Sequence, residues 1–158
     1  MSLIYILDGY NLINHRLFSR FAKKLNSCQN LIFLINTKRL CGSLKNKIIL
    51  VFDGYPPKAP LKAERENLEI IFTKNDSADN QIRRIIEEIA NPKNVMVVSD
   101  DKEIRFFVSA LGAKVLSVED FFAPIKPKKM LMQQPLKFEL TYSQIQKINQ
   151  ELKKIWLK

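Results

Sequence analysis

The stretch Leu3-Ile-Tyr-Ile-Leu-Asp-Gly-Tyr-Asn11 sets the pattern of this chain, because a short apolar run ends abruptly at an acid. A run of this length, rich in β-preferring residues and stopped by Asp-Gly, predicts a buried strand. Four later runs are predicted to be strands on the same grounds, and two of them also stop at an aspartate. They span residues 47–52, 68–73, 95–98 and 113–116.

Helical periodicity fills the intervals between these strands. Residues 30–40, 78–90 and 104–111 carry apolar residues at helical spacing, with Ser77 as a predicted cap of the second helix and Gly112 as the end of the third. Strands that alternate with helices predict an α/β fold of three layers, α/β/α, around a central parallel five-stranded sheet.

Length and composition favour one folded domain. The 158 residues are 46% hydrophobic and 27% charged, with only four glycines, and the longest apolar runs are far shorter than a membrane span. No basic leader precedes the first strand, and Cys28 and Cys41 form no Cys-x-x-Cys pair. We therefore expect a cytoplasmic protein with free core thiols and no membrane partner.

The positive charge is concentrated toward the C-terminus. The formal net charge is +10, of which residues 1–122 contribute +4 and residues 123–158 contribute +6. We expect 1–122 to form the main domain and 123–158 to be a basic linker with a C-terminal helix packed on it. The apolar stripe of that helix comprises Ile145, Ile148, Leu152 and Ile155. Such a charge favours a polyanionic partner, although a solubilising lysine face is the alternative for the tail taken alone.

Four aspartates follow the predicted strands or open a helix beside them. Asp8, Asp53 and Asp100 end strands, and Asp79 lies on the first turn of the helix after the third strand. Each alone has the ordinary explanation of a turn former or a helix cap. However, the carboxyl ends of parallel strands share one edge of the sheet, where ligands bind. Clustered carboxylates there predict a hard divalent cation, Mg²⁺ or Mn²⁺.

Neighbouring polar residues support this edge as a site. We expect a tight turn at Gly9 to bring the Asn11 amide to the Asp8 carboxylate, and Ser99 either to assist in the same way or to cap a helix. The proline-rich loop 54–67 carries Lys58, Lys62 and Arg65, which we expect to contact a polyanionic substrate beside Asp53.

Motifs for nucleotide binding and for nucleophilic catalysis are absent from the sequence. The sequence has no Gly-x-x-x-x-Gly-Lys loop and no Gly-x-Gly-x-x-Gly turn, so no nucleotide cofactor is expected. The single histidine, His15, is expected to be structural, and no Ser/His/Asp set or cysteine nucleophile stands out. Carboxylates with a metal suit phosphodiester hydrolysis without a histidine base.

Four segments together resemble a known family. They are Ile6-Leu-Asp-Gly-Tyr-Asn11, Val51-Phe-Asp53, Ile70-Ile-Phe-Thr-Lys-Asn-Asp-Ser-Ala-Asp79 and Val97-Val-Ser-Asp100. In this order and spacing they are similar to NYN domains, and more narrowly to the YacP-like branch of the PIN-like ribonuclease group. The resemblance covers residues 1 to about 122, while the tail beyond Pro124 is similar only loosely.

The resemblance implies a PIN-like fold and a Mg²⁺- or Mn²⁺-dependent endoribonuclease. By motif position it implies Asp8, Asn11, Asp79 and Asp100 as the catalytic residues, and Asp8, Asp79 and Asp100 as the metal ligands. Asp53 and Ser99 are expected to support them. Ribosome-associated mRNA is one substrate that the resemblance implies, which makes the ribosome a candidate partner.

The chain departs from the family pattern after Asp79, where Arg83 stands in place of an acid that many relatives carry. We expect RNA contacts from Arg83 and from the tail lysines Lys126, Lys128 and Lys129. Two alternatives remain open. The first is a non-catalytic RNA- or ribosome-binding module of the same fold. The second is a phosphatase of the haloacid dehalogenase type, which needs an acid where Tyr10 stands.

Overall fold

The computed structural model describes residues 2–20, 27–125 and 142–156. Contacts divide the chain into two compact units, Met1–Lys126 and Pro127–Lys158, which are described separately. The second unit contains one described helix, α7 (Tyr142–Trp156). The expected packing of this helix on the domain therefore stays a prediction, and Lys126, Lys128 and Lys129 lie outside the described residues.

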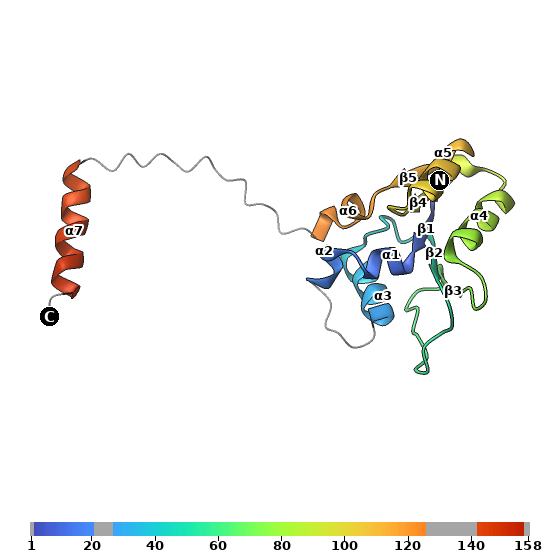
Figure 1. Cartoon of the computed structure of the whole chain (residues 1–158), viewed down its shortest axis with the longest axis horizontal. Helices are drawn as coiled ribbons and strands as arrows, with labels where there is room; N and C mark the ends of the chain where they lie inside the picture. Colours follow the sequence, from blue (N-terminus) through green and yellow to red (C-terminus); the bar gives the residue numbers. More distant parts are fainter. Residues whose placement is uncertain (1, 21–26, 126–141, 157–158) are drawn as a thin grey trace. The chain divides into compact units, whose positions relative to one another are not determined.

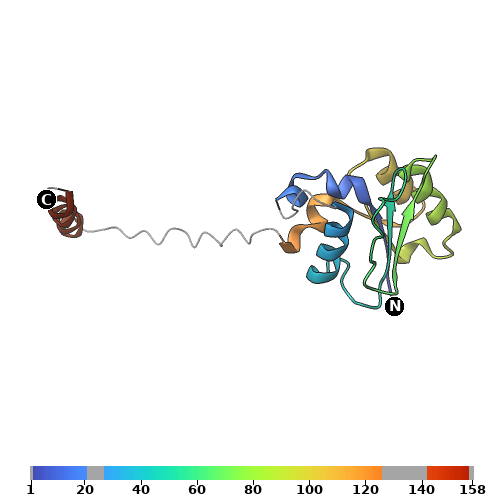
Figure 2. The ribbon, with the colours of Figure 1, turned by 90° about the horizontal axis from the view of Figure 1, so that it is seen from below.

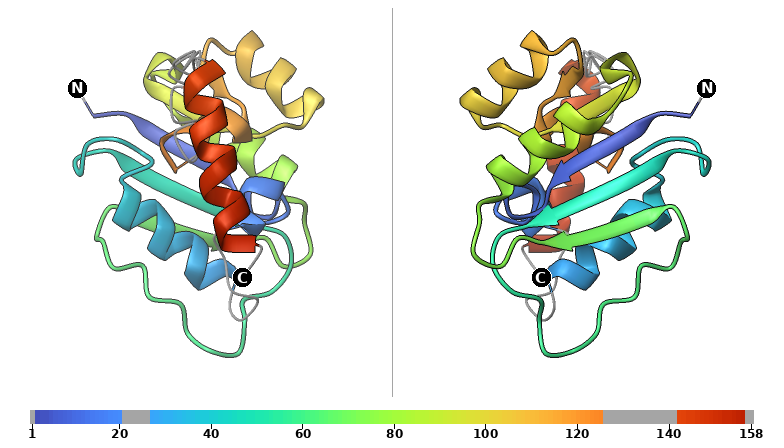
Figure 3. Two further views of the ribbon diagram at one scale, coloured as in Figure 1. Left: turned by 90° about the vertical axis from the view of Figure 1, so that its left-hand side faces the viewer. Right: turned by 90° about the vertical axis from the view of Figure 1, so that its right-hand side faces the viewer.

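The first unit is built on five parallel strands in the order β3-β2-β1-β4-β5. They are β1 (Ile4–Asp8), β2 (Lys47–Phe52), β3 (Leu68–Phe72), β4 (Val95–Val98) and β5 (Lys114–Leu116). Figure 3 shows β1, β2 and β3 side by side and pointing the same way. The predicted parallel five-stranded sheet is confirmed, with strand bounds within one residue of those expected.

Helices cover both faces of the sheet (Figures 1 and 2). They are α1 (Gly9–Ile13), α2 (Arg16–Ser19), α3 (Ser27–Lys38), α4 (Ala78–Glu88), α5 (Lys102–Ala110) and α6 (Val118–Phe121), with short 3-10 turns η1 (Pro92–Asn94) and η2 (Ala123–Ile125). One core packs α1, α2, α3 and α6 against side chains such as Leu50 and Phe52, and the other packs α4 and α5 against side chains such as Ile49 and Val97. The three-layer α/β/α expectation is confirmed.

Local signals explain where the longer helices begin and end. The Ser77 side chain accepts a hydrogen bond from the Asn80 N–H and so caps α4. Asp101 caps α5 by accepting from the N–H groups of Glu103 and Ile104. Gly112 follows α5 with φ +86°, a backbone conformation that glycine adopts readily.

The expected tight turn at Gly9 is wrong. Gly9 is the first residue of α1, and Asp8 is the N-cap of that helix. Glycine is needed here for space, because a Cβ at Gly9 would stand 2.3 Å from atoms of the Phe52 ring. The sequence shows the glycine, whereas only the packing of β2 under α1 shows why it is there.

Two smaller observations complete the fold. Cys28 and Cys41 are free thiols, as expected. Among the residues that the structure describes, no helix is long and apolar enough to cross a membrane.

Candidate active site

The order of the strands places β1 and β4 side by side at the centre of the sheet, with the chain turning outward in both directions from them. This is the switch point of an open parallel sheet, beyond whose carboxyl ends ligands bind. Asp8 ends β1, Asp53 follows β2, and Ser99 and Asp100 follow β4. The structure thus brings the predicted strand-end residues to one edge, and α4 adds Asp79 from its first turn.

Asp8 is the most buried of these acids, with 6% of its surface exposed. The pKa of Asp8 is raised from its ordinary 3.8 to about 6, chiefly by burial and in smaller part by the nearby charges of Asp79 and Asp53, while two hydrogen bonds from Asn11 oppose the shift. Asp8 therefore carries negative charge that the residues around it compensate only in part.

Asn11 connects the ends of β1 and β4. Its side-chain amide donates to Asp8 Oδ2 at 3.4 Å and to Ser99 Oγ at 3.3 Å. Ser99 is fully buried, and its Oγ also accepts from the Asp101 N–H at 3.1 Å. Ser99 thus fixes Asn11 and the start of α5. It does not face solvent where a substrate would lie.

Asp79 is the second acid whose ionisation is disfavoured. Burial raises its pKa, as do the charges of Asp101, Asp53 and Glu103, whereas Arg83 lowers it. Asp53, which follows β2, connects this strand to α4, because its carboxylate accepts a hydrogen bond from the Ala78 N–H at the start of α4. The Asp53 contact thereby ties the end of β2 to the helix that carries Asp79.

Asp100 is placed differently from the other predicted ligands. Its side chain is exposed and accepts a hydrogen bond from the Val118 N–H at 2.9 Å, at the start of α6. Asp101 is the acid on this side that raises the Asp79 pKa. Both acids follow β4 directly, and the backbone direction that separates their two side chains is not visible in the sequence.

The chemistry of these donors fits a hard divalent cation. They are carboxylate and amide oxygens, and the pKa values of Asp8 and Asp79 are raised first by burial and in smaller part by neighbouring acids. Within the described part of the chain, however, no three or more His, Cys, Asp or Glu side chains form a group that could hold a metal ion. The donors are therefore gathered at one edge but not arranged around one point.

The predicted basic residues are divided between two edges. Lys58 and Lys62 are exposed. Arg65, in contrast, donates to Asn67 Oδ1 and to the Leu44 carbonyl, at the amino ends of β3 and β2. Because β2 and β3 are parallel, the loop between them must return along the whole sheet. The expectation that all three lie beside Asp53 is therefore wrong for Arg65.

Arg83 lies on α4 one turn beyond Asp79. Its Nη2 is 3.7 Å from Glu103 Oε2, and its guanidinium carbon is 5.2 Å from the centre of the Phe107 ring. His15, as expected, has a structural contact, since its Nδ1 accepts from the Leu17 N–H.

A parallel α/β/α domain with acids at the carboxyl edge of its central strands is the PIN-like fold. The family model described as the YacP-like NYN domain matches residues 5–158, and the chain belongs to that family. NYN domains are generally nucleases that act on RNA, so this chain carries a ribonuclease-type domain.

Two solved structures are similar to this one. Rae1 (YacP) from Bacillus subtilis matches with 21% identity and a TM-score of 0.58, over 98% of this chain and 82% of that one. Its W164L mutant matches with 24% identity and a TM-score of 0.56, over 77% of this chain and 73% of that one. No curated protein matches the chain significantly.

Proposed function

We propose that this protein is a metal-dependent endoribonuclease that hydrolyses RNA phosphodiester bonds at the carboxyl edge of its sheet. The observation that carries the proposal is the buried Asp8, held at the switch point by Asn11 and surrounded by the charges of Asp53 and Asp79. Burying a carboxylate among like charges is costly unless a cation compensates it, and family membership supports RNA as the substrate.

Each residue has a defined task in this proposal. Asp8 and Asp79 would hold Mg²⁺ or Mn²⁺, joined by Asp100 as the family motif implies. The chemistry that such a cation supplies is charge neutralisation and polarisation at the scissile phosphate. Asn11 holds Asp8 in place through its two hydrogen bonds, and Asp53 holds the first turn of α4 and thereby Asp79.

RNA binding would come from basic residues in several parts of the chain. Phosphates would be contacted by Lys58 in the exposed loop, Arg83 on α4 and the lysines of the tail. Such contacts position the RNA strand but do not recognise its sequence. The net charge of +10 supports a polyanionic substrate. Ribosome-associated mRNA is the specific substrate that we propose from the family resemblance.

The experiment is cleavage of end-labelled RNA by the full chain with Mg²⁺, Mn²⁺ or EDTA. We expect internal cuts with either cation, none with EDTA, and none with the Asp8→Asn variant. Glu87→Gln is the matched control, because Glu87 is an exposed acid near the far end of α4. Cleavage by Asp8→Asn at the parental rate would overturn the proposed site.

The alternative, a non-catalytic RNA- or ribosome-binding module, is favoured by one observation. The Asp100 side chain accepts a hydrogen bond from the Val118 N–H, and within the described residues Asp8, Asp79 and Asp100 do not form a group that could hold a metal ion. RNA binding without cleavage under both cations would select this alternative.

A further inference from the structure

An exposed aromatic side chain lies close to the acidic edge. Phe106, on the second turn of α5, is 80% exposed and is the most exposed large hydrophobic side chain among the described residues. An apolar ring left in water forgoes the free energy of burial, so a ligand that covers it gains that free energy on binding. Phe106 makes this surface a candidate for contact with a flat, partly apolar group.

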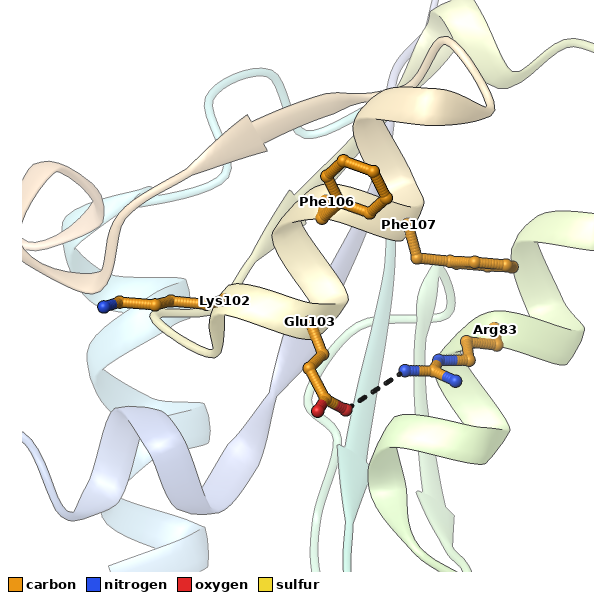
Figure 4. A pocket seen from close by; sticks show the side chains of 5 residues that line it. All are labelled: Arg83, Lys102, Glu103, Phe106 and Phe107. Atoms are coloured by element: carbon orange, nitrogen blue, oxygen red, sulfur yellow. Dashed lines mark ion pairs between the residues drawn. The ribbon is translucent and has the colours of Figure 1, made fainter.

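Phe106 borders a shallow depression between α4 and α5. The cavity measures about 380 Å³ and is lined by Arg83, Lys102, Glu103, Phe106 and Phe107. Figure 4 shows the Phe107 ring beside the Arg83 guanidinium, the Glu103 carboxylate turned toward Arg83, and Lys102 extending from the first turn of α5. Two aromatic rings and the Arg83 guanidinium thus share one small surface, and Lys102 borders it with its ammonium extending away from the rings.

The Arg83–Glu103 contact leaves the guanidinium available to another anion. The Nη2 to Oε2 distance is 3.7 Å and the Glu103 side chain is 83% exposed, and such surface pairs add little stability. Arg83 Nε is buried and has no hydrogen-bond acceptor among the described residues. A phosphate can therefore replace Glu103 at Arg83 with little loss of stability. The planar guanidinium can donate two hydrogen bonds to phosphate oxygens.

The residues that line the depression are close in sequence to those of the candidate active site. Arg83 follows Asp79 by four residues on α4, which places both side chains on one face of the helix. Lys102 and Glu103 come directly after Asp101, the cap of α5. A nucleotide in the depression would adjoin a phosphate at the acids.

We propose that this depression holds an unpaired base of single-stranded RNA, with Phe106 as the stacking surface and Lys102 and Arg83 on the flanking phosphates. The proposal rests on the proposed function, and it adds a position beside the acids that stacks on one base. Stacking on an aromatic ring requires a free base face, which a duplex does not offer and every unpaired base has. The site would thus select single strands and would not choose among bases.

The test is binding of the full chain to a fluorescently labelled oligoadenylate in EDTA, followed by anisotropy, so that no cleavage occurs. Phe106→Ala should weaken binding by about 5- to 150-fold, the range that loss of one base–aromatic stack gives. Phe106→Trp should restore the parental affinity and quench the emission of a 2-aminopurine placed in the oligonucleotide. Phe33→Ala is the matched control, because Phe33 is also exposed but lies on α3, in the opposite helical layer.

The outcomes separate this proposal from the nuclease assignment. If the parent cleaves RNA and Phe106→Ala binds RNA as the parent does, the base-stacking proposal is contradicted and the nuclease proposal is supported. The exposed Phe106 would then be a candidate contact for a protein. If Phe106→Ala loses affinity for RNA while no cation supports cleavage, the base-stacking proposal is supported and the nuclease proposal is contradicted. Equal losses for Phe33→Ala and Phe106→Ala, or equal affinity of the parent for duplex and single strand, would also overturn the surface.

Discussion

Both oxygens of the Asp8 carboxylate accept hydrogen bonds from Asn11. Oδ1 accepts from the backbone N–H and Oδ2 from the side-chain amide, each at 3.4 Å. Because Asp8 caps α1 and Asn11 lies on its first turn, the same helix end fixes the acid and supplies the amide. Ser99 then ties this amide to β4.

The Asn11→Ala variant tests this arrangement. Loss of the amide frees one oxygen of Asp8 and leaves the buried Ser99 hydroxyl with one hydrogen bond fewer, so we expect cleavage to fall by about tenfold or more. Stability should fall by about 1 kcal/mol, the usual net value of a hydrogen bond. The control is Asn14→Ala, an exposed asparagine that follows α1. An Asn11→Ala variant that cleaves at the parental rate would contradict a role for this amide.

The raised pKa of Asp8 predicts that the metal-free protein loses stability as the pH rises. The folded state keeps the Asp8 proton up to about pH 6, whereas the unfolded chain releases it near its ordinary 3.8. Between these values the folded state binds more protons, so the free energy of unfolding falls with rising pH. The loss reaches up to about 3 kcal/mol above pH 6.

Thermal unfolding in EDTA from pH 4 to pH 8 measures this effect. Asp8→Asn removes the titrating group but keeps a side chain that caps helices well, so it should melt several degrees above the parent at pH 7.5. Mg²⁺ or Mn²⁺ should raise the parental melting temperature and leave that of Asp8→Asn unchanged. A parent whose stability does not fall between pH 4 and 6, relative to Asp8→Asn, would refute the uncompensated charge at Asp8.

The contact between Gly9 and Phe52 predicts a cost for any side chain at position 9. The new methyl group of Gly9→Ala would overlap the Phe52 ring, which is fully buried between Tyr10 and Phe72. Overpacking of this kind costs typically about 1–3 kcal/mol. Urea unfolding should show that loss, and the double variant Gly9→Ala/Phe52→Leu should lose less than the two single changes added together. Additive losses would mean that the methyl group finds room elsewhere.

The sequence predicted the sheet well because its signals are local. The run from Lys47 to Phe52, its acid at Asp53 and the Ser77 cap each depend on neighbours in the chain, and the structure confirms them as a strand end and a helix start. The short helices α1 and α2 carry weak periodicity, and they were missed. The distinction between Asp100 and Asp101 depends on which backbone N–H each side chain meets, Val118 for one and Glu103 for the other, and therefore on tertiary structure.

The loop after Asp53 should be cut by trypsin after Lys58 before it is cut after Lys62. The Lys62 backbone is held by Gln29, which donates to its carbonyl and accepts from its N–H, and the Ala63 carbonyl accepts from Asn36. Lys58 lies among three prolines in the exposed part of the loop. Single-stranded RNA should slow the cut at Lys58, and Gln29→Ala should speed only the cut at Lys62. Equal cutting of Lys58 with and without RNA would count against its contact with substrate.

The tail lysines Lys126, Lys128 and Lys129 should add affinity without selecting the cleavage position. Lysine contacts with phosphate release counterions, so changing all three to Ala should weaken RNA binding and reduce its salt dependence by up to about three counterions. Phosphate contacts carry no sequence information, so the cut positions should stay the same.

The matched control for the tail is the triple change of Lys45, Lys93 and Lys114 to Ala. It removes the same charge from exposed lysines that precede or begin β2, β4 and β5, at the amino edge of the sheet opposite the acids. Binding across a salt series, together with mapped cut sites, distinguishes the cases. The same change in salt slope for both triples would mean that the tail lysines act only through their charge and not through their position in the chain. A shifted cut site in the tail variant alone would mean that these lysines help to choose the target.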